Sequence, residues 1–135
     1  MSRELLVPMD DSATARAALE HALSAFPDAD VTVVHVVDDL EAGYGGTPTA
    51  DDAAEIDIFE DASAIAAEVD RTVETELLGG TAADAILEYA HAEGVDGIVM
   101  GSEGRSGVSR MLLGSVAEAV TRRSSVPVTI VPAPE

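Results

Sequence analysis

The sequence predicts an α/β fold, in which one open sheet of five parallel strands carries helices on both faces. Two observations lead to this prediction. Apolar runs of strand length alternate with segments of helical periodicity along the chain, and the run Gly97–Met100 is apolar without alternation, as in a strand covered on both sides. The chain has 135 residues, of which 47% are hydrophobic. We therefore expect a single domain over residues 1–135 with an aliphatic core.

The first half of the chain is predicted to hold two strands and two helices. The strands are the apolar runs Leu5–Val7 and Val31–Val37. Ser12 can cap a helix between them, with a buried stripe of Ala15, Ala18, Leu19, Ala22 and Leu23. A glycine-rich acidic loop over residues 38–54 leads into a long acidic helix at roughly residues 51–72. The expected inner side of that helix consists of Ile56, Phe59, Ala66, Val69 and Val73.

The second half is predicted to hold three more strands, Val73–Leu78, Val95–Met100 and Val126–Val131, with helices between them. Both helices begin with the Ser/Thr-x-x-acid capping pattern, at Thr81–Asp84 and at Ser115–Glu118. Each helix also has an apolar stripe, formed by Ile86, Leu87 and Ala90 in one and by Val116, Ala119 and Val120 in the other.

The charge balance is strongly acidic. Asp and Glu total 26, against seven basic residues that are all arginine, and the net charge is −19. Such a charge repels nucleic acid, because nucleic-acid binding depends on neutralising phosphates. It also destabilises the compact state by self-repulsion, which salt screens as the Debye length falls from about 10 Å at 0.1 M to about 3 Å at 1 M. We therefore expect a halophilic protein; the alternative is that the acidity only provides solubility.

Composition also excludes several kinds of catalytic and metal site and indicates where in the cell the protein is located. Cysteine is absent, which excludes disulfides, thiolate catalysis and cysteine-ligated metal sites. The three histidines lack metal-ligand spacing, and we predict His21 and His91 on helix surfaces and His35 in a strand. No apolar run approaches the roughly 18 residues that cross a membrane, and the start of the chain is unlike a signal peptide. We expect a cytoplasmic protein with no membrane partner.

A glycine-rich segment follows the unbroken apolar run. It contains Gly101-Ser-Glu-Gly104 and, after nine more residues, Gly114-Ser115. This order of a strand, a glycine loop and a helix start is typical of a phosphate site, because glycines allow close approach and free amides attract an anion. A helix start at Ser115 would leave the amides of Ser115–Ala117 available to a ligand. The alternative is that the glycines only form turns. Lysine is absent, which excludes a Walker A loop, and the first strand–helix turn lacks the G-x-G-x-x-G pattern.

Asp10 is the second candidate site residue. In an open parallel sheet, ligands bind beyond the carboxyl ends of the strands, where the strand order reverses. If the first and fourth strands are neighbours there, Pro8–Asp11 lies beside Gly101–Gly104. Asp10 could then bind a ribose hydroxyl or help to hold Mg²⁺. Alternatively, Asp10 or Asp11 only caps the helix that begins at Ser12.

These motifs together resemble the universal stress protein family, in its ATP-binding branch. The spacing Gly101-x2-Gly104-x9-Gly114-Ser115 is similar to the family's nucleotide-binding signature, and Leu6–Ser12 to its opening strand and V-P-x-D-x-S turn. The resemblance extends over nearly the whole chain, through His35–Asp38, Gly80–Ile86 and Gly101–Val131. It implies a Rossmann-like fold, similar to that of the adenine nucleotide alpha hydrolases, with strand order 3-2-1-4-5.

The resemblance also implies a site and a partner. Asp10 would meet the ribose or a metal, Pro8 and Met9 would line the nucleotide, and the backbone of Val36 would read the adenine edge. Met100 would lie against the nucleoside. The phosphates would be wrapped by Gly101, Gly104, Gly114, Ser115 and Val116. A homodimer would form through the C-terminal strand Val126–Val131, which is consistent with an apolar sheet edge that otherwise risks aggregation.

Two positions depart from the family pattern. Position 103, commonly His, is Glu103, whose carboxylate would repel a phosphate by roughly 1 kcal/mol at 4 Å in water; Arg105, a bridging Mg²⁺ or salt would offset that repulsion. Position 9, commonly a small hydroxyl residue, is Met9. We therefore expect a homodimer that binds ATP or a related adenine nucleotide and acts in stress response or regulation. The alternative is a nucleotide-independent dimeric interaction module.

Enzyme activity, if present, is expected to be at most a slow ATPase. The sequence offers no positioned general base, no phosphate-binding lysine and no arginine finger beyond Arg105.

Overall fold

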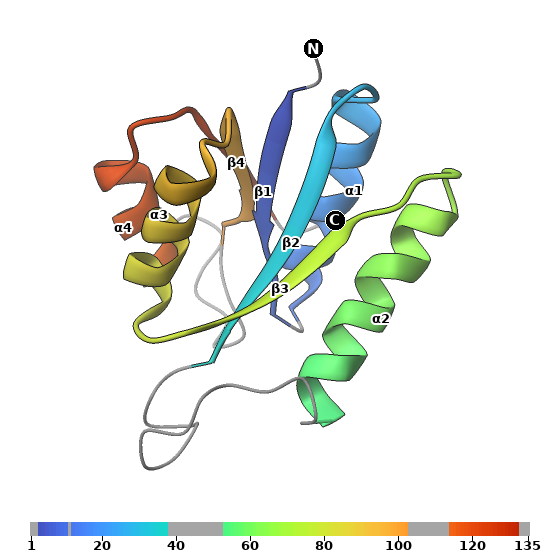
Figure 1. The fold of residues 1–135 in the computed structure, drawn as a ribbon, viewed down its shortest axis with the longest axis horizontal. Helices are drawn as coiled ribbons and strands as arrows, with labels where there is room; N and C mark the ends of the chain where they lie inside the picture. The colour runs from blue at the N-terminus through green and yellow to red at the C-terminus, as the bar shows by residue number, and fades with distance from the viewer. Residues whose placement is uncertain (1–2, 11, 38–52, 103–113, 133–135) are drawn as a thin grey trace.

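The computed structural model describes residues 3–10, 12–37, 53–102 and 114–132, which form alternating strands and helices (Figure 1). In chain order the elements are β1 (Glu4–Pro8), α1 (Ala13–Ala25), β2 (Asp30–Val37), α2 (Ala53–Ala67), β3 (Glu74–Gly79), α3 (Ala82–Glu93), β4 (Gly97–Gly101), α4 (Ser115–Arg123) and β5 (Val128–Val131).

The strands form one parallel sheet in the order β3-β2-β1-β4-β5, which confirms the predicted fold class and strand order. β1 lies at the centre, between β2 and β4. Its last pair with β2 joins Pro8 to Val34, and its ladder with β4 includes Leu5 opposite Gly97. The strand order reverses between β1 and β4, so ligands are expected beyond the carboxyl ends of these two strands.

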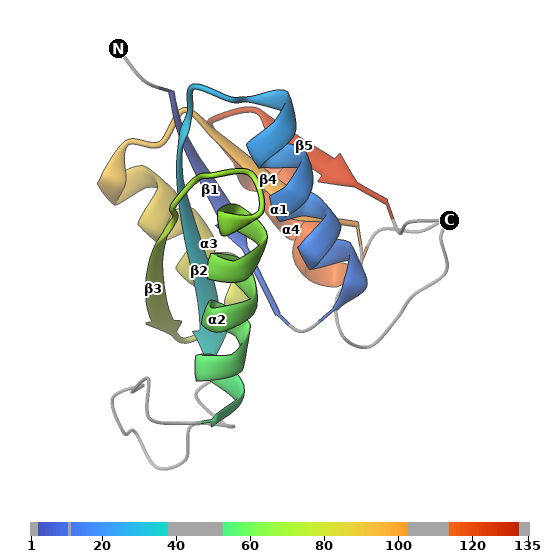
Figure 2. The same ribbon diagram turned by 90° about the vertical axis from the view of Figure 1, so that its right-hand side faces the viewer.

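The helices cover both faces of the sheet. α1 and α2 pack on one face, and α3 and α4 pack on the other (Figures 1 and 2). Because successive strand residues point to opposite faces, Leu5 and Val7 pack with α1 and α2 while Leu6 packs with α3 and α4. In the described ranges, none of the helices is long and apolar enough to cross a membrane.

α2 differs from the predicted long helix. It ends at Ala67, and Asp70, with a φ of 57°, turns the chain toward β3. The buried inner residues of α2 include Ile58, Ala62 and Ala66. Placing Val69 and Val73 on the inner side of this helix is therefore wrong. Val69 is 51% exposed, and Val73 follows the helix and packs against the same core from the chain leading into β3.

Two strands begin two residues later than predicted, and β3 begins one residue later, at Glu74. β4 begins at Gly97 and β5 at Val128, rather than at Val95 and Val126. Val95 instead lies in the turn that ends α3, because its amide donates to the carbonyl of Ala90. This bond accompanies Gly94, whose left-handed conformation ends α3.

The helix caps are predicted correctly in part. Ser12 caps α1, as expected, since its Oγ accepts a hydrogen bond from the amide of Ala15 at 3.2 Å. Thr81 is the N-cap of α3 but makes no side-chain capping bond. The N-cap of α4 is Gly114 and not Ser115, because the Gly114 carbonyl accepts the first helical bond from Glu118 at 2.9 Å.

Candidate functional site

The candidate site lies at the carboxyl edge of the sheet. β1 and β4 are parallel neighbours, so the residues that follow Pro8 and those that follow Met100 leave the sheet on the same side. β2 continues past the end of β1, because Pro8 pairs with Val34 whereas β2 extends to Val37. The structure therefore brings the predicted residues of β1, β2 and β4 to one edge.

Asp10 forms part of the turn from β1 into α1. Its Oδ1 accepts a hydrogen bond from the amide of Ser12 at 2.8 Å, and Ser12 in turn caps the helix. Asp10 thus supports the cap residue, which favours the structural alternative for this carboxylate. That role does not conflict with ligand binding, since a carboxylate has two oxygens and about four acceptor sites.

Met9 directs its side chain away from the site and into the core. The residue is 4% exposed and packs in the core between the sheet and α1. Its amide donates to the carbonyl of Val34 at 2.8 Å, and its carbonyl oxygen lies 2.8 Å from Nδ1 of His35. Methionine fits here because the position is apolar, and the side-chain hydroxyl common in the family would have to find a partner within the core.

Gly101 is required by the packing of β4 against the first turn of α1. A Cβ at this position would lie 2.5 Å from Oγ1 of Thr14 and 2.8 Å from its backbone carbonyl carbon. Thr14 is itself 1% exposed, so it has little room to move away. This contact fixes the spacing between the first turn of α1 and the end of β4. It also explains why position 101 is a glycine, which the sequence alone did not reveal.

Ser102 and Gly114 join the end of β4 to the start of α4. The amide of Ser102 donates to Val131 at 2.9 Å, and its carbonyl accepts from the amide of Gly114 at 2.7 Å. Because its N-cap is a glycine, α4 has no side-chain cap over its first turn. The N-terminal amides of α4 and the positive end of its dipole therefore stand at the carboxyl edge of β4, which suits an anion.

Most of the predicted site residues meet at this edge. Pro8, Asp10, Val36 and Val116 are half-buried, Met100, Gly101 and Gly114 are buried, and Ser115 is exposed. Glu103, Gly104 and Arg105 lie outside the described residues. His35 also belongs to this group, although the sequence indicated only a strand residue. Its contact with Met9 depends on the register of β1 and β2, which no local pattern reveals.

The described residues do not provide a metal site of their own. Among them, no group of three or more His, Cys, Asp or Glu side chains could hold a metal ion. His21 and His91 are exposed on α1 and α3, as predicted. Within the described ranges, Asp10 therefore belongs to no group of three such side chains.

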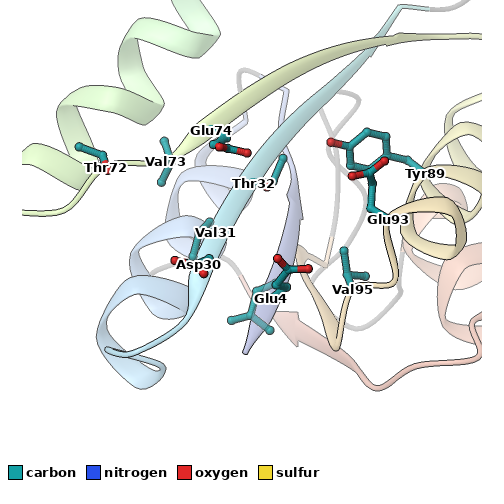
Figure 3. Close-up of a pocket in the computed structure, with 11 residues that line it drawn as sticks. Glu4, Asp30, Val31, Thr32, Thr72, Val73, Glu74, Tyr89, Glu93 and Val95 are labelled. Carbon is teal, nitrogen blue, oxygen red and sulfur yellow. The ribbon is translucent and has the colours of Figure 1, made fainter. Parts of the chain in front are cut away.

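A separate pocket of about 370 Å³ opens at the opposite, amino edge of the sheet (Figure 3). It lies between the starts of β1, β2 and β3 and the last turn of α3, and its lining includes Tyr89 and the carboxylates of Glu4, Asp30, Glu74 and Glu93. Burial raises the pKa of the Tyr89 phenol above its usual range, and nearby glutamates, Glu76 first, raise it further. No local sequence pattern indicated this pocket, because its carboxylates come from four separate elements.

Comparison with known proteins agrees with this architecture. The model of the universal stress protein family matches residues 1–132. The universal stress protein MJ0531 of Methanocaldococcus jannaschii is 32% identical over 145 residues, which cover 98% of this chain and 84% of that protein.

Solved structures have the same fold. The structure of MJ0577, a universal stress protein of the same archaeon, has a TM-score of 0.76 at 30% identity and covers 97% of this chain and 96% of that one. A universal stress protein solved in complex with cAMP also has a TM-score of 0.76, at 24% identity over 98% of both chains. This chain belongs to the universal stress protein family.

Proposed function

We propose that this protein binds ATP or a related adenine nucleotide as a homodimer and acts in stress response or regulation. One arrangement carries the proposal: the uncapped first turn of α4 stands at the same sheet edge as the turn that follows β1. This arrangement would let one ligand meet amides that attract phosphate and a carboxylate that suits a ribose.

The phosphates would bind at the start of α4. Gly114 places no side chain over the amides of Ser115 and Val116, and the helix dipole favours negative charge there. Gly101 would contribute close backbone approach, and Gly104 and Arg105 would complete the cradle that the sequence predicts. Because the net charge of the chain is −19, this local positive potential has to come from backbone dipoles and a few arginines.

The nucleoside would lie across the ends of β1, β2 and β4. The backbone of Val36 would read the adenine edge, Met100 would contact the nucleoside, and Pro8 and Met9 would line it through their backbone. Asp10 would bind the ribose hydroxyls. If Mg²⁺ accompanies the nucleotide, Asp10 is the residue that would hold it, together with phosphate oxygens, which this hard cation prefers.

The dimer would form through β5. This strand is an edge of the sheet, and its four residues are all half-buried within one chain. Pairing with a second copy would cover an apolar edge that otherwise invites aggregation. Sedimentation equilibrium should then give twice the mass of one chain.

We also propose that the protein works in a salt-rich cytoplasm.

Calorimetry with ATP, ADP and AMP, in the presence of Mg²⁺ and concentrated KCl, tests the nucleotide site. We expect binding at millimolar nucleotide or below, and loss of binding in Gly114→Val, whose side chain would cover the start of α4. The φ of −64° and ψ of 158° at Gly114 are open to valine, but Gly114 is buried, so the melting temperature of this variant has to show that it is folded under the conditions of the assay.

The other outcomes separate the alternatives. A dimer without binding at millimolar nucleotide would contradict the proposal and favour a nucleotide-independent interaction module. Phosphate release well above that of Gly114→Val would instead reveal a slow ATPase.

A further inference from the structure

His35 links the end of β2 to the turn that follows β1. Its side chain is 7% exposed, and its Nδ1 lies 2.8 Å from the carbonyl oxygen of Met9. A carbonyl oxygen only accepts hydrogen bonds, so Nδ1 carries the hydrogen and donates it. The bond therefore fixes the tautomer of the ring as well as its orientation.

The register of the sheet shows which bond this contact replaces. The amide of Met9 donates to the carbonyl of Val34 at 2.8 Å. In a parallel ladder, the carbonyl of such a residue accepts from the amide two positions further along the partner strand, which here is Val36. Within the described part of the chain, the Met9 carbonyl is bonded to the imidazole and not to Val36.

The amide of Val36 points toward the β1 side of β2, at a level beyond the last residue of β1. Val34 bonds toward β1, through Met9, whereas Val37 bonds toward β3, through the amide of Gly80. Backbone groups alternate along a strand, so those of Val36 point in the same direction as those of Val34. β1 ends at Pro8, and the space beside Val36 is the edge proposed above for adenine.

We propose that His35 is a positioning residue: by donating to the Met9 carbonyl, its imidazole ends the β1–β2 ladder and keeps the Val36 amide available to a ligand at the sheet edge. The same bond holds Met9, which lies in the chain between Pro8 and Asp10, two residues of the proposed nucleotide site. The link to adenine rests on the proposed function; the effect on the ladder does not.

Hydrogen exchange of the ligand-free protein tests the effect on the ladder. His35→Leu removes the donor, so the Val36 amide can pair with the Met9 carbonyl, and its exchange should slow by roughly tenfold or more relative to that of Val34. His35→Asn carries its amide nitrogen on Cγ, as histidine carries Nδ1, and should exchange like the parent. Equal relative exchange at Val36 in the parent and in His35→Leu would overturn the proposal.

Nucleotide affinity tests the link to adenine. His35→Leu should weaken binding by roughly tenfold, as expected for one lost hydrogen bond, and His35→Asn should restore it. Val31→Ala is the matched control: Val31 is buried on the same face of β2 but pairs with Leu5 at the far end of the ladder, so this variant should lower the melting temperature and leave affinity unchanged. Equal affinity in all variants would overturn the assignment.

The two tests also separate this inference from the proposed function. If the parent binds no adenine nucleotide but the Val36 exchange changes as described, the proposed function fails and the role of His35 in the ladder stands. Nitrogen NMR of the ring gives a third measure, since the parent should show the tautomer with hydrogen on Nδ1. The opposite tautomer would contradict the proposal whatever the ligand.

Discussion

The two edges of the sheet have opposite characters, although the same strands build both. Among the described residues, the carboxyl edge contains the uncapped first turn of α4, close glycine packing and the half-buried carboxylate of Asp10. The amino edge contains a pocket of about 370 Å³ lined by four carboxylates and a tyrosine with a raised pKa (Figure 3). The helix amides at the first edge attract an anion, whereas the carboxylates at the second repel one.

The parallel topology explains part of this difference. Each helix runs back across the sheet to start the next strand, so helices begin near the carboxyl edge and end near the amino edge (Figures 1 and 2). Helix N-termini carry partial positive charge and C-termini partial negative charge. The last turn of α3, with Glu93, adds to the negative potential of the amino pocket. Because this strongly acidic chain has no lysine, the proposed phosphate site would depend on backbone amides and arginine.

The largest effect is expected when a methyl group is added to the glycine at the carboxyl end of β4. Gly101→Ala should destabilise the fold by about 3 kcal/mol, because its Cβ would lie 2.5 Å from Oγ1 of Thr14 and 2.8 Å from the backbone of the same residue. Gly97→Ala is the matched control at the amino end. Its Cβ would lie 3.3 Å from Cδ2 of Leu5, the end of a flexible side chain, and should cost less than about 1 kcal/mol.

Urea unfolding of the two variants measures this contrast. Equal losses would show that the close contact between β4 and α1 at the carboxyl edge does not restrict position 101 more than position 97.

A smaller effect is expected from salt. Raising KCl from about 0.1 M to about 2 M should raise the melting temperature by about 4 °C or more, equivalent to roughly 1 kcal/mol, because screening relieves the repulsion of a net charge of −19. A flat or falling response would contradict the salt-adapted interpretation.

The same measurement can locate the repulsion. At low salt, Glu74→Gln in the amino pocket should raise the melting temperature more than Glu20→Gln, an exposed position on α1 outside the pocket. In concentrated KCl the two variants should converge. If they are already equal at low salt, the repulsion is not concentrated at the amino edge.

The smallest effect concerns the ionisation of Tyr89. Its folded pKa is raised, by burial first and by neighbouring glutamates second, so the folded protein holds the phenol proton more tightly than the unfolded chain. The resulting stability is present below about pH 10 and is lost as the pH rises through the folded pKa. Phenolate absorbance in a Tyr44→Phe background, which leaves Tyr89 as the only tyrosine, should show ionisation above pH 10.

Two controls identify the cause of that shift. Glu93→Gln should lower the pKa of Tyr89, whereas Glu20→Gln should not change it. Concentrated salt should reduce the shift without removing it, because burial is its largest cause. A normal pKa for Tyr89 at low salt would show that the amino pocket is neither dry nor strongly negative.

The sequence predicted the features of this molecule that depend on local pattern. The unbroken apolar run of β4 and the capping serine of α1 are local, and both are confirmed. Ser115–Glu118 matched a capping pattern, but the cap is Gly114, because a match of residue types does not determine which carbonyl accepts the first helical bond. α2 ends earlier than its composition indicated, because the turn at Asp70 leads the chain back into β3.

Features that depend on register could not be predicted in this way. The bond from His35 to Met9 requires β1 to end where β2 continues. The contact that explains Gly101 joins the first turn of α1 to the end of β4, more than half the chain away. Both are consequences of strand order, so they follow from the sequence only after the fold is known.

The hydrogen bond between Ser102 and Gly114 has a consequence for how such a protein can be altered. It joins Ser102 and Gly114, the residues that flank the segment 103–113, at 2.7 Å, so the end of β4 and the start of α4 are held together without help from that segment. We therefore expect that the eleven intervening residues can be replaced by those of another family member while both anchor residues keep their places.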